Sequence, residues 1–186
     1  LGGVSNALEA LLDGAASNDR GDELDAIREQ HYSLAADLGL DANELIGESF
    51  HQLEQLVAGV RLVREVSVRV RVRVMALGEL MATRLGAAFL ARSGIAVRWL
   101  DARDIMVSKT QAIADLERGY VAAICDYDFD PGMVGHLDST GEFVLTHGFI
   151  ARNELGETVL LGSGGSDSSA AYLESRLGDR RLEVWT

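Results

Sequence analysis

The spacing of apolar residues changes near Gly94, and this change constrains the fold more than any other feature. Before that glycine, apolar side chains recur at helical spacing, as at Val4, Leu8, Leu11 and Leu12. After it, short apolar runs alternate with helical or turn segments. The runs that we expect to form strands are 96–100, 121–125, 143–151, 159–161 and 182–185. Strands that alternate with helices indicate an α/β fold with a mainly parallel sheet.

Glycines and capping residues mark the expected ends of the helices. Gly14 would end the first helix, and Gly39 stands where a helix over 22–38 would end. Asp41 or Asn43 would cap the next helix. The apolar face of that helix would consist of Leu45, Ile46, Leu53, Leu56, Val57 and Val60. We expect these helices to form a scaffold.

Residues 66–74 alternate valine with polar residues, among them Arg69, Arg71 and Arg73. This alternation by itself predicts an edge strand with one charged face. The residues from 74 to 89 keep helical spacing, so we expect a loop that gives way to a helix near position 70. A basic ribbon for nucleic acid is the alternative for the three arginines, but the acidic net charge favours a solvated face.

Composition and charge exclude several classes of protein. The 186 residues suit one compact domain, and the hydrophobic fraction of 47% is far from that of disordered chains. The formal net charge of −12 would repel a phosphate backbone, so we expect no binding to nucleic acid or anionic lipid. No uninterrupted apolar run approaches the ~18 residues of a membrane span. With the single cysteine, Cys125, these features predict a cytoplasmic protein.

A glycine-rich turn is expected after the strand 159–161, before a helix of small residues. Its sequence is Leu161-Gly162-Ser163-Gly164-Gly165-Ser166-Asp167. Ser166 or Asp167 can cap the helix, whose N-terminal N–H groups favour an anion by ~0.3–1 kcal/mol. The carboxylate of Asp167 would repel a bare anion but could bind an ammonium group. An amino acid carries both charges and fits the turn, although a glycine turn before a capped helix also occurs for purely structural reasons.

Glu79 is an acidic residue in the most apolar part of an expected helix. At the edge of a core, its carboxylate would need a charged or hydrogen-bonding partner. The alternative is a solvated glutamate on the outer face of the helix. Both interpretations stay open at this point.

Residues 126–132 begin like a calcium-binding loop, but the pattern fails. Pro131 stands at the sixth position, where glycine is needed, and Leu137 at the twelfth, where glutamate is needed. The four histidines have no metal-ligand spacing with one another or with Cys125. We therefore expect an acidic turn and no metal site.

Seven motifs occur in the order found in aspartokinases, and this resemblance covers nearly the whole chain. They are Leu1-Gly2-Gly3-Val4-Ser5-Asn6-Ala7-Leu8, Leu77-Gly78-Glu79, Trp99-Leu100-Asp101-Ala102-Arg103, Gly148-Phe149-Ile150-Ala151-Arg152-Asn153, Gly156-Glu157-Thr158, the glycine turn, and Glu183-Val184-Trp185-Thr186. The fourth motif and Ser169-Ala170-Ala171-Tyr172 resemble most the kinase half of bifunctional aspartokinase/diaminopimelate decarboxylase proteins.

The resemblance implies a fold and an activity. The fold is the three-layer α/β/α sandwich of amino acid kinases, and the activity is transfer of the ATP γ-phosphate to the side-chain carboxylate of L-aspartate, a step in lysine, threonine and methionine biosynthesis. An aspartate side chain with a pKa of ~3.9 is already ionised at neutral pH, so no general base is needed. Mg²⁺, cationic side chains and backbone N–H groups must instead overcome the repulsion between two anions.

The resemblance also implies roles for single residues. Glu79 would bind the amino group of the substrate, and Asp167 would support the catalytic polar network. Ser163, Ser166 and the backbone of Gly164 and Gly165 would line the aspartate pocket. Thr186 corresponds to the threonine that begins the nucleotide-binding segment of the family.

Ser163 departs from the family pattern, which usually has arginine between these glycines. That arginine would grip the aspartate carboxylate in a bidentate contact, which is typically worth ~1.5–3 kcal/mol. A serine hydroxyl cannot make this contact, so we expect weak or altered substrate binding. A Ser163→Arg variant of a complete version of the protein should then bind aspartate more tightly.

The resemblance further implies that residues 1–186 form a partial catalytic domain, truncated at both ends. The opening strand of the family, with its Lys-Phe-Gly-Gly-Thr loop, would precede Leu1, and the nucleotide-binding and regulatory parts would follow Thr186. Lys109, the single lysine, lies at neither place. We therefore expect no measurable kinase activity from these residues alone, and exposed sheet edges would favour a homo-oligomer.

Two alternatives to an aspartate kinase remain open. An amino acid kinase with another acidic substrate would account for Ser163. A non-catalytic module for amino-acid binding or assembly would account for the missing lysines.

Overall fold

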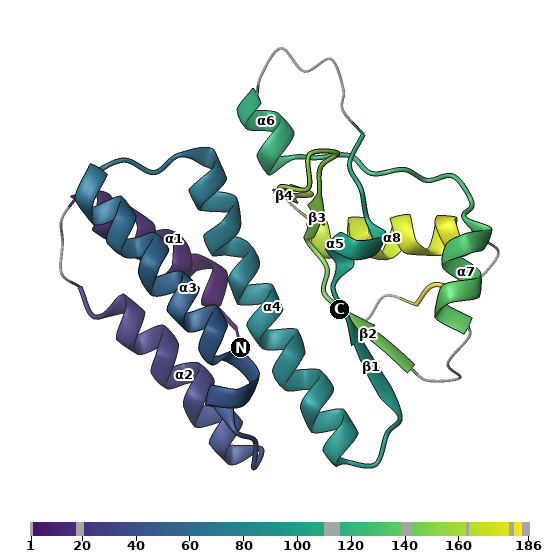
Figure 1. The fold of residues 1–186 in the computed structure, drawn as a ribbon, viewed down its shortest axis with the longest axis horizontal. Helices are drawn as coiled ribbons and strands as arrows, with labels where there is room; N and C mark the ends of the chain where they lie inside the picture. The colour runs from purple at the N-terminus through teal and green to yellow at the C-terminus, as the bar shows by residue number, and fades with distance from the viewer. Residues whose placement is uncertain are drawn as a thin grey trace. The chain divides into compact units, whose positions relative to one another are not determined.

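The computed structural model describes residues 2–17, 21–109, 116–138, 143–162, 164–178 and 181–183. The chain divides into two compact units, Leu1–Ile95 and Ala96–Thr186 (Figure 1). The first is helical and the second mixes helices with strands, as the change of pattern near Gly94 predicts.

The first unit is a bundle of long helices. Its helices are α1 (Val4–Ser17), α2 (Glu23–Asp37), α3 (Ala42–Val63) and α4 (Val68–Arg92). α1 packs on α2, α3 and α4, and α3 runs beside α4 (Figure 1). The core consists of side chains with at most 1% exposure, among them Leu8, Leu12, Ile46, Leu53, Met81 and Leu85. Burial of these faces stabilises helices that would be marginal in isolation.

The predicted helix ends are mostly confirmed. α2 ends one residue before Leu38, and Gly39 follows with a φ of +68°. The side chain of Asp41 caps α3 by accepting a hydrogen bond from the Glu44 N–H at 3.2 Å. The end predicted at Gly14 is wrong, because α1 continues to Ser17. A glycine inside a helix costs only about 1 kcal/mol relative to alanine, which packing can offset.

The loop-to-helix transition near position 70 is confirmed, and the edge strand is wrong. α4 begins at Val68, and the Ser67 hydroxyl accepts a hydrogen bond from the Val70 N–H at 3.3 Å. Arg69 and Arg73 are exposed, as expected for a solvated face. Arg71 differs, because it is half-buried and pairs with Glu9 of α1.

α4 is long and apolar enough to cross a membrane, judged by length and composition only. Half of its most apolar window is buried inside the protein. The core helix of a soluble bundle meets the same criterion, so this is weak support for a membrane span.

The second unit consists of short elements. Its strands are β1 (Val97–Leu100), β2 (Phe143–Thr146), β3 (Ile150–Arg152) and β4 (Thr158–Leu160), and its helices are α5 (Ala102–Ile105), α6 (Leu116–Val121), α7 (Pro131–Asp138) and α8 (Gly165–Leu177). β1 pairs with β2 in parallel, and β3 pairs with β4 in antiparallel register. The described strands thus form a parallel pair and an antiparallel pair, and the mixed α/β class is confirmed.

Two of the five predicted strands are confirmed, and the structure differs from the prediction at the other three. The strands at 96–100 and 159–161 are confirmed within one residue. The strand at 121–125 is wrong, because α6 runs to Val121 and Cys125 makes an isolated bridge with Ser108. The run 143–151 is interrupted at 147–149, where the chain turns a corner between β2 and β3. Leu182 and Glu183 lie outside any strand, and residues 184 and 185 lie outside the described residues.

Candidate functional site

The glycine turn joins β4 to α8 as the sequence predicts. Gly162 and Gly164 have φ values of +80° and +71°, in the left-handed region that favours glycine. The N–H of Gly165, the first residue of α8, donates to the carbonyl of Gly162 at 3.0 Å and closes the turn. Ser163 lies outside the described residues.

The first turn of α8 presents Ser166 and Asp167 to solvent. The predicted cap by one of these side chains is wrong, because Gly164 occupies the N-cap position and no side chain of the described residues caps the helix. The N–H groups of Ser166 and Asp167 lie where an α-helix supplies no backbone partner of its own. Such N–H groups at a helix N-terminus suit a carboxylate or a phosphate.

A second segment, the corner His147-Gly148-Phe149, lies directly against this turn. A Cβ atom added at Gly148 would meet the Ser166 Cα at 2.8 Å, and one added at Gly165 would meet the Phe149 Cα at 3.1 Å. Backbone therefore contacts backbone, and both positions need glycine. The corner fixes where the first turn of α8 lies within this unit.

Phe149 is held in an uncommon conformation. Its φ of +71° lies in the left-handed region, which costs a residue with a side chain roughly 1–2 kcal/mol. The Phe149 N–H donates to the Ser169 hydroxyl oxygen at 2.9 Å, and its carbonyl accepts from the Leu161 N–H at 2.8 Å. The Ser169 hydroxyl in turn donates to the Gly165 carbonyl at 2.7 Å. Strain that the surroundings maintain in this way is concentrated at functional sites.

Gly148, Phe149 and Ser169 have a structural role that the sequence pattern did not predict. The available signal was a glycine inside the apolar run 143–151, because such a glycine often marks a close backbone approach. Because the whole run 143–151 was predicted as one strand, Gly148 was not interpreted as a close backbone approach.

A partly buried polar cluster includes His147, the first residue of the corner. The His147 side chain is fully buried, and its Nε2 lies 3.1 Å from Oδ1 of Asp101. Arg103 donates to the same carboxylate, with Nη2 at 2.5 Å from Oδ2. Burial by itself raises the pKa of Asp101, but hydrogen bonds from His147 and Arg103 outweigh it and hold this pKa well below its usual range. Asp101 is therefore ionised at neutral pH.

Glu79 belongs to α4 in the first unit, where it is half-buried and has an interaction partner. Its predicted contact with the amino group of a ligand at the glycine turn stays a prediction, because the turn belongs to the second unit. Thr186, the predicted nucleotide-binding residue, lies outside the described residues.

Two carboxylates of the acidic turn at 126–132 form ion pairs and a hydrogen bond with other residues of the protein. Asp126 pairs with Lys109 at 3.0 Å. Asp130 accepts from the Met133 N–H at 3.0 Å and pairs with Arg176. In the described parts of the chain, no group of three His, Cys, Asp or Glu side chains could hold a metal ion.

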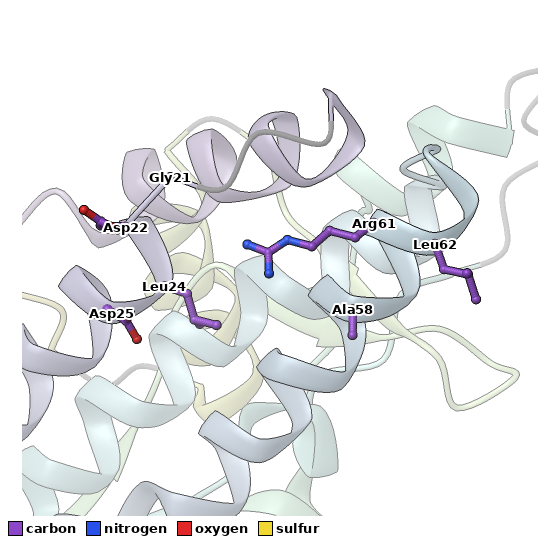
Figure 2. Close-up of a pocket in the computed structure, with 7 residues that line it drawn as sticks. All are labelled: Gly21, Asp22, Leu24, Asp25, Ala58, Arg61 and Leu62. Atoms are coloured by element: carbon purple, nitrogen blue, oxygen red, sulfur yellow. The ribbon is translucent and has the colours of Figure 1, made fainter.

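A hollow of about 670 Å³ lies in the bundle between the start of α2 and the end of α3 (Figure 2). It is lined by Gly21, Asp22, Leu24, Asp25, Ala58, Arg61 and Leu62. The Arg61 side chain extends from α3 toward the start of α2 (Figure 2). Asp22, Asp25, Ala58 and Leu62 are exposed, so the hollow is open to water and offers no enclosed polar site.

Comparison with known proteins places this geometry in a family. The model of the amino acid kinase family matches residues 17–186, across both compact units. Aspartokinase 3, chloroplastic, of Arabidopsis thaliana is 32% identical over 181 residues, which are 95% of this chain and 31% of that protein. Lysine-sensitive aspartokinase 3 of Escherichia coli is 28% identical over 190 residues, which are 99% of this chain and 40% of that protein.

A solved structure agrees with the sequence comparison. The crystal structure of E. coli aspartokinase III in complex with aspartate and ADP matches with a TM-score of 0.75 and 27% sequence identity. The match covers 92% of this chain and 37% of that chain, which confirms the predicted amino acid kinase fold. The chain spans less than half the length of these relatives. On the family match and the shared fold, the chain belongs to the amino acid kinase family.

Proposed function

We propose that this chain is part of an aspartate kinase, which transfers the γ-phosphate of ATP to the side-chain carboxylate of L-aspartate. The observation that carries the proposal is the glycine turn, which presents backbone N–H groups, Ser166 and Asp167 together at the start of α8. By the resemblance to aspartokinases, this turn would correspond to the aspartate-binding motif. The relatives reported above are named as aspartokinases.

The proposed reaction needs positioning more than proton transfer. A free aspartate side chain has a pKa of ~3.9 and is already a carboxylate nucleophile at neutral pH. The N–H groups of the α8 turn and the Ser166 hydroxyl would bind a substrate carboxylate, with the glycine backbone of Gly164 and Gly165 close against it. Asp167 would order the polar groups around the transferred phosphate, and Glu79 would pair with the substrate ammonium group.

ATP and Mg²⁺ are part of the proposal. The E. coli relative was solved with aspartate and ADP, which supports a nucleotide site in the intact enzyme. Mg²⁺ usually keeps several waters and binds through phosphate oxygens and one or two carboxylates. Phosphate oxygens would hold much of this ion, which would reduce the repulsion between the two anions. Thr186 would take part in nucleotide binding.

We further propose that residues 1–186 alone give no measurable phosphoryl transfer. Lys109 is the single lysine of the sequence, and its ammonium pairs with Asp126. This hydrogen bond raises the pKa of Lys109 and keeps the charge within the acidic turn. Residues 1–186 therefore supply no further lysine that could bind the phosphates of ATP. We also propose that the intact enzyme is cytoplasmic and acts in lysine, threonine and methionine synthesis. It would do so with or without a fused decarboxylase.

The test measures ATP-dependent formation of aspartyl phosphate, trapped as the hydroxamate. It uses the 186-residue chain and the longest protein that its gene encodes, each with aspartate, glutamate and acetylglutamate. We expect the longer protein to phosphorylate aspartate, and Ser166→Ala to lower kcat/KM at least tenfold while the exposed-surface control Ser33→Ala does not. A preference for glutamate or acetylglutamate would contradict the aspartate assignment and support the alternative that Ser163 motivates.

Calorimetry separates the remaining alternative, a non-catalytic module. Titration of the longer protein with aspartate and ATP should give binding of both ligands. Binding of aspartate alone, without turnover, would contradict the kinase proposal and support the binding module.

A further inference from the structure

The parallel pair β1–β2 brings two polar residues together at its end. Leu100 pairs with Thr146 in the register, and Asp101 and His147 are the next residues of the two strands. Since the carboxyl ends of parallel strands meet at one edge, these two side chains meet there. The His147 Nε2 lies 3.1 Å from the Asp101 Oδ1 and the same distance from the Ala102 nitrogen.

The ionised carboxylate of Asp101 is anchored from several directions. Its side chain accepts a hydrogen bond from the Arg103 N–H at 3.0 Å and so caps α5. The Arg103 guanidinium binds both carboxylate oxygens and donates to the Thr158 hydroxyl of β4 at 3.1 Å. Arg152 of β3 donates to the Arg103 carbonyl at 2.8 Å. The position of Asp101 is therefore fixed relative to β3, β4 and α5.

The polar contacts that the described residues give His147 all lie at its Nε2. Its Nδ1 is buried and has no hydrogen-bond partner within the described residues. Among the described residues, the ring is held by the hydrogen bond that Nε2, when it carries the ring proton, donates to the Asp101 Oδ1 at 3.1 Å. A change on the Asp101 side should therefore free the ring and the backbone that follows it.

We propose that the Asp101–His147 pair is a positioning element, which holds the corner 147–149 against the first turn of α8. His147 is bonded directly to Gly148, whose α-carbon abuts Ser166. Phe149 follows in its strained conformation and ties the corner to Leu161 and Ser169. Asp101 and His147 are thus not catalytic residues, and they act through Gly148 and Phe149. The inference rests on the proposed function, because it assigns them to the aspartate-binding turn.

A purely structural pair would give a different result. A buried hydrogen-bonded pair can stabilise a unit without fixing any particular loop, and its loss would then lower only the free energy of unfolding. A positioning pair must in addition keep Phe149 in the left-handed region, since strained residues persist only where their surroundings determine them. Hydrogen exchange at the amide groups that hold the corner therefore distinguishes the two roles.

The test compares His147→Leu, which removes the contact with Asp101, with His147→Gln, whose side-chain amide can still donate to it. Met133→Ala, at a buried position of α7, is the control for lost stability alone. Hydrogen exchange is measured at the Phe149 and Leu161 amides of the 186-residue chain. Aspartate affinity is measured by calorimetry on the longest protein that the gene encodes.

We expect His147→Leu to raise exchange at both amides and to weaken aspartate binding by about tenfold, or ~1.4 kcal/mol. His147→Gln should recover most of both effects, and Met133→Ala should show neither after correction for its stability. If His147→Leu does not fold, His147→Phe takes its place, because it keeps a ring at the buried position and cannot donate to Asp101. Unchanged exchange at the Phe149 and Leu161 amides would overturn the inference.

The same experiment separates the inference from the proposed function. If the unaltered protein binds no aspartate, the proposed function fails, and the exchange measurement still decides whether the pair positions the corner. If aspartate binds and the exchange rates change while the affinity does not, the pair shapes the corner without serving the binding site, which also overturns the inference.

Discussion

The interior of the helical bundle and the interior of the α/β unit are packed in different ways. The bundle packs aliphatic side chains between long helices, and Leu8, Leu12 and Leu53 are fully buried there. The α/β unit has short strands, and backbone atoms of its corner and its glycine turn lie in direct contact. Side-chain volume should therefore decide stability in the bundle, whereas clearance around the backbone should decide it near the candidate site.

The largest effect is expected from a cavity in the bundle. Leu53→Ala removes a fully buried side chain of α3 and should lower the free energy of unfolding by ~2–5 kcal/mol. Urea denaturation followed by circular dichroism measures this change. Leu62→Ala makes the same chemical change on the same helix at a site that is 85% exposed, and should stay within about 0.5 kcal/mol. Equal losses for both variants would contradict a core-dominated bundle.

Near the candidate site, adding a single methyl group should be harmful. Gly148→Ala would place a Cβ atom 2.8 Å from the Ser166 backbone and should lower the free energy of unfolding by about 1–3 kcal/mol. It should also abolish aspartate binding, since the first turn of α8 must move. Denaturation and calorimetry measure the two effects.

Two further glycines serve as controls for this variant. Gly135→Ala in α7 meets no atom within 4 Å and should be tolerated. Gly78→Ala in α4 would approach the Leu8 Cδ1 at 2.9 Å, but that atom ends a side chain that can rotate away. A greater loss for Gly78→Ala than for Gly148→Ala would contradict the contrast between the two units.

The third prediction concerns a buried histidine of the bundle. Burial lowers the pKa of His31, which has an ordinary value of 6.5, and only the hydrogen bond between Nδ1 and the Ile27 carbonyl opposes this shift. Below pH ~6.5 the unfolded chain therefore binds a proton that the folded chain resists, so stability falls as pH decreases. The slope contributed by one such group is at most about 1.4 kcal/mol per pH unit.

The comparison of His31→Leu with the unaltered chain isolates this contribution. Urea denaturation at pH 8 and pH 5 should show a smaller loss for the variant, because it has no ring to protonate. His51→Gln is the matched control, since His51 is exposed in the same bundle. An unchanged pH dependence in His31→Leu would show that other groups cause the loss.

The bundle was more predictable from the sequence than the α/β unit, and the reason is physical. Helix signals are local, so the cap at Asp41 and the end at Gly39 could be located from neighbouring residues. The glycine turn was found in the same way. The corner at Phe149 depends on Ser169, twenty positions away, and Asp101 meets His147 through strand pairing. No local pattern encodes such contacts.

The smallest expected effect is a gain in stability from a substitution in the bundle. Gly47 lies inside α3, where an added Cβ atom would meet only the Asn43 Cβ at 4.0 Å. Gly47→Ala should therefore raise the free energy of unfolding by ~0.5–1 kcal/mol, because alanine loses less backbone entropy on folding. Gly39→Ala should change stability with the opposite sign, since its φ of +68° disfavours a side chain. Thermal denaturation of both variants measures the difference, and a loss for Gly47→Ala would mean that even in the bundle the backbone lacks clearance.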